Sequence, residues 1–308
     1  MTALLSLPLL LPCVLPALAR RALARLAPAV ALWAITGCAV ALAGCSLAAL
    51  GAFVLIGLLK LPLFAAFGEL THPLHTAPAL IVVPAAATSV GALAVCSWTL
   101  VRSVLRQSRA FRAARTEAGS GPAAGDLCVV DSPRPDAYAL PGRPHRIVVT
   151  TAMLRSLDGA EREALFAHER AHNEGGHHYF LAAAELAAHC HPALRPVRET
   201  IRLAVERTAD EAAAASVGDR RLTARAIARA ALAGHAGGTP RPDFAAAATA
   251  GPVPQRVQAL LGTPRVPRAG RAVAALLVAC TALSGVTAAA GLADFHHRVE
   301  VAQGEATP

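Results

Sequence analysis

The sequence is poor in charged and aromatic residues. Of its 308 residues, 16% are charged and 4% are aromatic, whereas 55% are hydrophobic. The mean hydropathy is +0.46. Because soluble globular domains are about one-quarter charged, this composition excludes an ordinary soluble protein.

Two other classes of protein are excluded by patterns that are missing. The seven cysteines form no Cys-x-x-Cys pair, and five of them lie in apolar segments, so they do not form a disulfide framework. The net charge of +9 is not accompanied by a basic patch interleaved with aromatic residues. The arginines instead cluster beside apolar segments, where membrane topology and anionic lipid explain them. We therefore expect contact with membrane lipid and none with nucleic acid.

Four apolar blocks occur, at about 3–19, 28–59, 77–101 and 272–293. The last three exceed the roughly 20 residues that a helix needs to cross a bilayer. The first is shorter and contains three prolines, so a cleaved signal peptide is an alternative for it. No basic residue precedes this block, and Arg20, Arg21 and Arg25 follow it, which favours a retained helix. The sequence thus predicts four transmembrane helices, three of them within a membrane region at 1–101.

The arginines orient these helices. They cluster after the first block, after the third block at 102–115 and before the fourth block at 265–271. Since basic residues favour the cytoplasmic side, we expect a multi-pass protein of the cell membrane with its N-terminus outside. The polar segment 102–271 is then a cytoplasmic domain, the fourth helix spans 272–293, and 294–308 is a short extracytoplasmic tail.

Short strands are predicted near the start of the polar segment, at 127–130, 137–140 and 146–150, with a Pro-Gly turn after the second. A small sheet beside a helix can bind an extended peptide as an added strand. Tyr138 and Ala139 are the candidate edge residues for such a substrate. A purely structural hairpin is the alternative, and the two can coexist.

The most specific motif is His168-Glu169-Arg170-Ala171-His172, which has the pattern HExxH. On a helix, positions i and i+4 lie on one face, so both histidines can bind one metal ion, with Glu169 beside them as a general base. Asp158 and Glu161 fit a capping box that begins this helix, and Gly175-Gly176 ends it.

Two residues compete to be the third ligand. Gly175 and His178 complete the longer metzincin pattern, which also requires a downstream methionine. The two methionines of the chain, Met1 and Met153, both precede the motif. The alternative third ligand is Glu206 on a later predicted helix. Asp210, one turn further on, can accept a hydrogen bond from a ligating histidine and fix its orientation. The missing methionine favours Glu206.

These motifs resemble the gluzincin membrane peptidases, which include the Ste24/HtpX-type proteases and the BlaR/MecR-type sensor-transducers. The resemblance rests on HExxH, on Glu206-x-x-Ala209-Asp210 and on the strand segments, all within 128–211. Three predicted helices before this segment and one after it are similar to the BlaR/MecR type. Only about fifteen residues follow the last helix, and the sole lysine, Lys60, has no serine three residues before it. We therefore expect no penicillin-binding sensor domain and no S-x-x-K acylation site.

The expected fold is a mainly α membrane protein: four transmembrane helices and a cytoplasmic α+β gluzincin-type metallopeptidase domain with a small sheet. We expect a zinc metalloendopeptidase with one Zn²⁺ per chain, held by His168, His172 and Glu206, with Glu169 as general base and Asp210 in support. An oxyanion donor is also needed, and the candidates cannot be ranked: His177, His178, Tyr179 and Arg207.

Several functions fit this expectation. By resemblance, the protein or peptide substrate is a transcriptional repressor cut for regulation, with a partner protein supplying the signal. A Ste24/HtpX-like quality-control protease is an alternative, and a catalytically silent zinc-binding signalling scaffold is another. An intramembrane protease is disfavoured because charged residues surround HExxH, among them Glu161, Arg162, Glu163 and Arg170.

Overall fold

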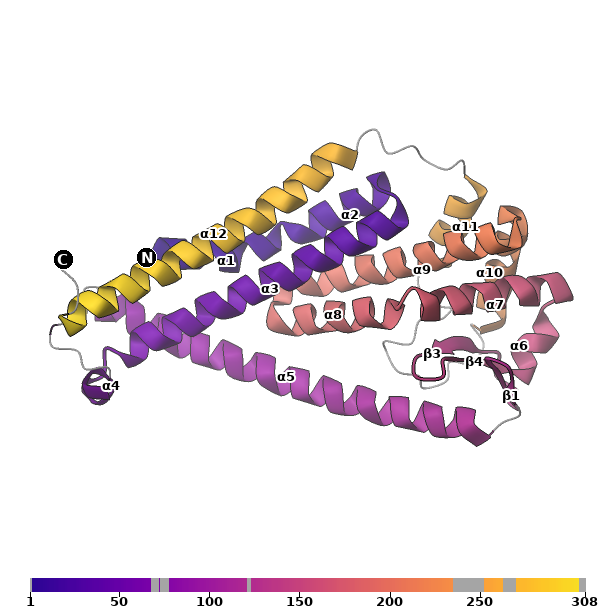
Figure 1. Ribbon diagram of the computed structural model, residues 1–308, viewed down its shortest axis with the longest axis horizontal. Helices are drawn as coiled ribbons and strands as arrows, with labels where there is room; N and C mark the ends of the chain where they lie inside the picture. The colour runs from indigo at the N-terminus through magenta and orange to yellow at the C-terminus, as the bar shows by residue number, and fades with distance from the viewer. Residues whose placement is uncertain are drawn as a thin grey trace.

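A computed structural model describes residues 2–67, 72, 78–120, 123–234, 252–262 and 270–304. Long helices form one end of the molecule, and shorter helices with a small sheet form the other (Figure 1). The chain is mainly helical, as the sequence predicts.

The N-terminal apolar block is a broken helix. It forms α1 (Thr2–Leu10), a 3-10 turn (Leu11–Cys13) and α2 (Leu15–Arg25), with a bend of 45° between the two parts. A proline removes a backbone N–H and clashes with the preceding turn, so Pro12 at the break accounts for the bend. The expectation of one helix over 3–19 is wrong in this respect, and the helical chain also extends further, to Arg25.

In the described part of the chain, three helices are long and apolar enough to cross a membrane: α3 (Pro28–Leu58), α5 (Ala79–Ser120) and α12 (Gly270–Gln303). The bent α1–α2 pair adds a fourth if it is one span. A short helix, α4 (Pro62–Phe67), follows α3. These apolar helices indicate a membrane-associated protein. Both α5 and α12 continue beyond the predicted spans, so residues 294–303 of the expected tail are helical.

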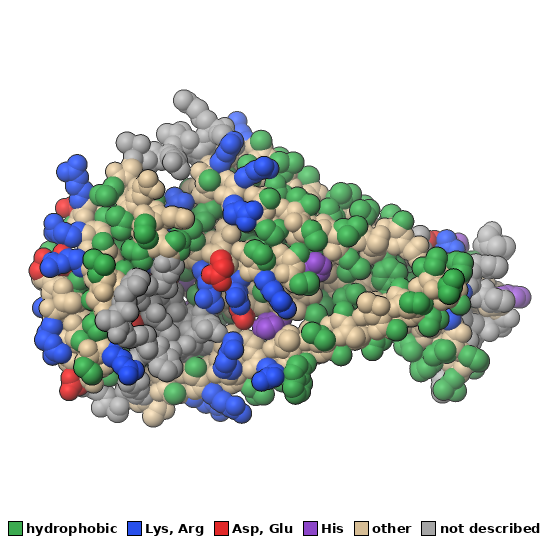
Figure 2. Space-filling view, turned by 180° about the vertical axis from the view of Figure 1, so that it is seen from behind, with side chains coloured by type: hydrophobic (Ala, Val, Ile, Leu, Met, Phe, Trp, Pro, Cys, Tyr) green, Lys and Arg blue, Asp and Glu red, His purple; other side chains and the backbone are tan. Residues whose placement is uncertain are grey.

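The basic segments lie toward one end of the long helices. The C-terminal end of α2, the N-terminal end of α12 and the C-terminal part of α5 all lie toward the half of the molecule that holds the sheet (Figure 1). Arg265 and Arg268 are outside the described residues. In Figure 2, Lys and Arg side chains gather over this wider half, and hydrophobic side chains cover the narrow end.

The sheet has four strands: β1 (Ala123–Ala124), β2 (Leu127–Val130), β3 (Ala137–Leu140) and β4 (Arg146–Thr150). Their order is β1-β2-β4-β3; β2 and β4 are parallel, and the other pairs are antiparallel. The three predicted strands are confirmed. The Gly/Ala-rich composition of 118–125 predicts a flexible link, but 118–120 belong to α5 and 123–124 form β1; residues 121 and 122 are outside the described residues.

Both faces of the sheet are covered. Tyr138, Leu140 and Val148 pack with Ala114 and Ala118 of α5. The opposite face contributes to a second cluster with the helices that follow the sheet, made of Ala137, Val149, Met153, Leu157, Leu165 and Ala230. A sheet covered on both faces needs apolar residues at successive positions, which explains why all four residues of β3 are buried.

Six α-helices are described between the sheet and α12. They are α6 (Thr151–Ser156), α7 (Gly159–Glu174), α8 (His177–Cys190), α9 (Arg195–Val217), α10 (Arg220–Gly234) and α11 (Val253–Leu261), with a 3-10 turn at Pro192–Leu194. The glycine- and proline-rich composition of 235–270 predicts a loop, and this prediction is wrong at α11. Residues 235–251 and 263–269 of that segment are outside the described residues.

The main hydrophobic core joins the long apolar helices to α8 and α9. It contains residues of α2, α3 and α12 together with Phe180, Leu181, Val197, Ile201 and Val205. Trp33 of α3 packs edge-to-face on Phe180, with ring centroids 4.7 Å apart. Helix α9, which carries Glu206 and Asp210, therefore packs directly on the apolar helices.

Candidate metal centre

Local sequence signals fix the position of α7. Asp158 and Glu161 form the predicted capping box: the Glu161 N–H donates to Asp158 Oδ1 (2.9 Å), and the Asp158 N–H donates to Glu161 Oε2 (3.1 Å). Glu161 also accepts hydrogen bonds from Arg225 and Arg229 of α10. At the other end, Asn173 Nδ2 donates to the Arg146 carbonyl of β4 (3.2 Å). These bonds hold α7 between α10 and the sheet.

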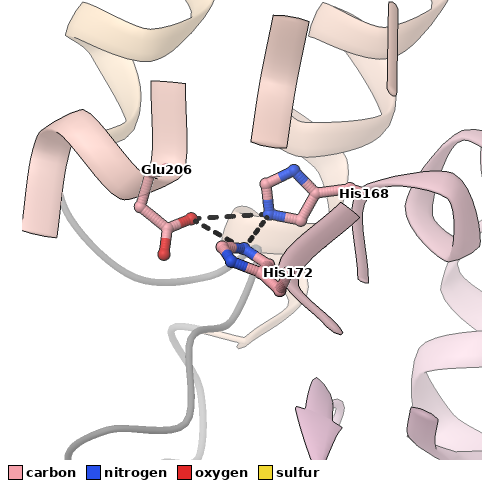
Figure 3. Close-up of side chains that lie close together, drawn as sticks. All are labelled: His168, His172 and Glu206. Carbon is pink, nitrogen blue, oxygen red and sulfur yellow. Dashed lines mark hydrogen bonds and ion pairs between the residues drawn. The ribbon is translucent and has the colours of Figure 1, made fainter. Parts of the chain in front are cut away.

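Three side chains from α7 and α9 converge at one point. Nε2 of His168 lies 3.0 Å from Nε2 of His172, one helical turn away. Glu206 Oε2 lies 3.4 Å from the first nitrogen and 3.8 Å from the second. The three side chains point toward one another (Figure 3) and are almost completely buried.

The separations of these atoms fit a metal ion. Ligand atoms about 2.0–2.2 Å from a tetrahedral zinc lie about 3.3–3.5 Å from one another. The observed values of 3.0, 3.4 and 3.8 Å bracket this range, and all three atoms can lie about 2 Å from one point. Two imidazoles and a carboxylate are also a donor set typical of catalytic zinc.

Asp210 and Arg256 extend the cluster. Asp210, one turn after Glu206 on α9, places Oδ1 3.1 Å from Nδ1 of His168. Arg256 of α11 donates to both oxygens of Asp210, from Nε to Oδ2 (2.9 Å) and from Nη2 to Oδ1 (2.7 Å). Its Nη1 lies 3.0 Å from Glu206 Oε2. Arg256 is fully buried, and no pattern in the sequence indicated a role for it at this site.

The charges of this cluster favour a divalent cation. Glu169, Glu206 and Asp210 are buried carboxylates, and Arg256 is a buried guanidinium. With both histidines neutral, as metal binding requires, the ionised forms of these four groups leave an excess of two negative charges. Buried charge is costly unless it is compensated. Burial lowers the pKa of His168, but Asp210 and Glu206 outweigh burial and raise it to about 9. The same field stabilises a metal cation between the ligand atoms.

His177 lies behind His172. Their Nδ1 atoms are 2.8 Å apart, and His177 is buried at the start of α8. Burial lowers the pKa of His177 to about 4, so its imidazole is neutral near pH 7. A Cβ on Gly175 would lie 2.6 Å from Nε2 of His177, so the glycine that ends α7 provides the space for this ring.

The other candidates from the sequence lie in different surroundings. His178 is partly buried against the exposed Tyr179, with ring centroids 4.0 Å apart; among the described residues, it is not in the metal-binding group. Arg207 Nη1 donates to the Leu23 carbonyl at the end of α2 (3.0 Å). Tyr138 is in the cluster beside α5, and Ala139 lies on β3, at the edge of the sheet.

Comparison with known proteins gives one match. Residues 106–191 match the model of peptidase family M48. This range runs from α5 through the sheet to α8; it includes His168, Glu169 and His172 and ends before Glu206. No curated protein and no solved structure matches the chain. The family match supports a metalloprotease of family M48, a type of enzyme that acts on proteins or peptides and usually uses a metal ion.

Proposed function

We propose that the protein is a membrane-embedded zinc endopeptidase that cleaves its substrate at the cytoplasmic face of the membrane. The observation that carries this proposal is the convergence of His168 and His172 of α7 and Glu206 of α9 on one point, next to Glu169 in the sequence of α7. The apolar helices support the membrane location. Clustering of the arginines toward the sheet-bearing end of the long helices supports the cytoplasmic orientation, with the N-terminus outside.

Each residue has a role in the proposed reaction. His168, His172 and Glu206 hold the metal ion, which supplies Lewis-acid activation of water and of the scissile carbonyl. Glu169 accepts a proton from the attacking water and passes it to the leaving amine nitrogen as the C–N bond breaks. Asp210 orients His168 through Nδ1, which keeps Nε2 directed at the metal.

Substrate binding is proposed along β3, the edge strand of the sheet. In an antiparallel pair, the backbone N–H and C=O groups of every second residue point to the neighbouring strand. The Thr150 N–H donates to the Asp136 carbonyl (3.0 Å), so Asp136, Tyr138 and Leu140 point these groups to β4. The backbone N–H and C=O of Ala139 therefore face away from β4. An extended peptide can pair with them as an added strand. Since Ala139 is only 4% exposed, binding there requires this edge to open.

The biological substrate is proposed by resemblance to the BlaR/MecR type: a transcriptional repressor cleaved in response to a signal from a partner protein. A Ste24/HtpX-like role in membrane-protein quality control is the alternative. A catalytically silent scaffold has no need for Glu169, which is fully buried beside the ligands.

The Glu169→Gln variant tests the proposed function. It removes the proton acceptor and leaves the three ligands intact, so we expect one bound zinc per chain and a loss of proteolysis of about 10²-fold or more. New protein N-termini are compared in native membranes that contain the wild type or the variant, with Glu163→Gln, an exposed carboxylate on the same helix, as control. Equal cleavage by wild type and Glu169→Gln would overturn the mechanism.

A further inference from the structure

Arg256 is carried by a helix whose position is fixed from two sides. Leu260 of α11 packs into a cluster with Ala214, Ala224 and Ile227, which lie on α9 and α10. Arg220 of α10 donates to the Leu260 carbonyl from Nε (2.9 Å) and to the Ala259 carbonyl from Nη2 (3.2 Å). These contacts hold α11 against the helix that bears Glu206 and Asp210.

The guanidinium contacts both acidic residues of α9. It donates two hydrogen bonds to Asp210, and it lies 3.0 Å from the oxygen of Glu206 that faces the histidines. Two donors in a rigid plane fix both the position and the rotation of a carboxylate, which a lysine ammonium cannot do. Asp210 Oδ1 is thereby held 3.1 Å from Nδ1 of His168.

We infer that Arg256 is a positioning residue of the metal centre. It acts through Asp210, whose carboxylate it orients toward His168, and through Glu206, whose charge it balances. Arg256 also sets the charge of the site. One guanidinium among the carboxylates of Glu169, Glu206 and Asp210 leaves the two negative charges that a single divalent ion neutralises. This inference deepens the proposed function and rests on it.

Removal of the guanidinium has a definite physical effect. Among the described residues, Asp210 then keeps the imidazole of His168 as its charged or polar side-chain partner, and its orientation is no longer fixed. Partners that orient a ligating histidine are worth about 10–100-fold in metal affinity. We expect Arg256→Met to weaken metal binding by about this factor. Arg256→Lys keeps the positive charge but lacks the planar guanidinium with its two parallel donors. We expect this variant to recover only part of the lost metal affinity.

The experiment measures Co²⁺ and Zn²⁺ affinity of the full chain in detergent micelles, by competition with a chromophoric chelator. Wild type, Arg256→Met, Arg256→Lys, Asp210→Asn and the Arg256→Met/Asp210→Asn double variant are compared. Arg225→Met is the matched control, because Arg225 binds Glu161 at the far end of α7. We expect Arg256→Met to weaken metal binding less in the Asp210→Asn background than in the wild type, because the part of its effect that acts through Asp210 is already lost there. The visible spectrum of bound Co²⁺ is expected to change in the Arg256 variants and not in Arg225→Met.

The outcomes separate this inference from the proposed function. Three results would overturn the role of Arg256 and leave the proposed peptidase standing. They are an unchanged metal affinity in Arg256→Met, a higher metal affinity in that variant, and full additivity of its effect with that of Asp210→Asn. Metal binding by the wild type with no dependence of proteolysis on Glu169 would overturn the peptidase and leave the role of Arg256 standing. A wild type that binds no metal would overturn both.

Discussion

Nδ1 of His177 lies 2.8 Å from Nδ1 of His172, so only one of these two nitrogens carries a hydrogen. When Nε2 of His172 binds a metal ion, its Nδ1 carries the proton and donates to His177. His177 therefore supports one ligating histidine as Asp210 supports the other. His177, one of the unranked oxyanion candidates from the sequence, thus lies where it can orient His172.

Replacement of His177 is expected to loosen the metal centre. His177→Ala removes the acceptor for His172, and we expect about 10–100-fold weaker zinc binding. The control is His178→Ala, the adjacent residue on α8 that lies beside Tyr179. The zinc content of each variant is measured after dialysis against a weak chelator. Loss of zinc in His178→Ala alone would support the metzincin alternative and contradict Glu206 as the third ligand.

Metal binding is expected to stabilise the fold. Zinc that binds only the folded chain raises the free energy of unfolding by about 2.7 kcal/mol when its concentration is a hundred times Kd. The thermal unfolding midpoint in micelles, measured with zinc and with excess chelator, should therefore differ. Glu206→Ala should abolish this difference, and Glu199→Ala, a change at an exposed carboxylate on the same helix, should preserve it. A zinc effect that survives in Glu206→Ala would place the metal elsewhere.

The backbone of Ala139 provides a test of substrate binding. Ala139→Pro removes an N–H that faces away from β4, so the β3–β4 hydrogen bonds are kept while a bond to substrate is lost. We expect kcat/KM for a peptide substrate to fall about tenfold, as for one lost hydrogen bond, with zinc content unchanged. Ala139→Gly retains the N–H and is the matched control. Equal kcat/KM values in the two variants would exclude pairing of the substrate with Ala139.

Glu161 gives the cap of α7 a pH dependence. Burial raises the pKa of Glu161, but hydrogen bonds from Arg229 and from the Asp158 N–H outweigh burial and hold the pKa below its ordinary value. A lowered folded-state pKa contributes stability above the unfolded pKa of about 4.3, and this is lost as the pH falls through the folded value. We expect Glu161→Gln to be less stable than the wild type by about 1 kcal/mol at pH 7.

This difference should disappear on acidification. Once the pH falls below the lowered folded-state pKa of Glu161, the wild-type carboxylate is protonated, and the unfolding midpoints of wild type and Glu161→Gln should converge. Glu163→Gln, at an exposed position two residues on, should follow the wild type at every pH. A constant gap between wild type and Glu161→Gln from pH 7 to pH 3 would show that charge is not the cause.

Local patterns in the sequence predicted the parts of the site that depend on local geometry. HExxH needs only the helical period, and the capping box needs only residues three positions apart. Glu206 is 34 residues after His172, and its place beside the histidines depends on how α9 packs on α7. The sequence supplied this pairing through family resemblance and the missing methionine, not through any local rule.

Arg256 could not be predicted by the same reasoning. Arginine is usually exposed, and this one lies in a segment rich in glycine and proline that predicts a loop. Pro252 and Pro254, at the beginning of α11, are residues that favour a helix start. Val253, Val257 and Leu260 repeat at helical spacing after them. These signals identify the helix, but only the folded chain shows that its arginine reaches Asp210.

The core shared by α3 and α9 has a mechanical consequence. Val205 packs with the apolar helices, and the next residue, Glu206, faces the two histidines. One peptide unit thus separates the core of the apolar helices from the candidate metal centre. A sideways shift of α9 against α3 changes the distance between Glu206 and the histidines directly, without an intervening domain or linker. The packing of a single helix on its apolar neighbour therefore controls whether the three candidate ligands can meet at one point.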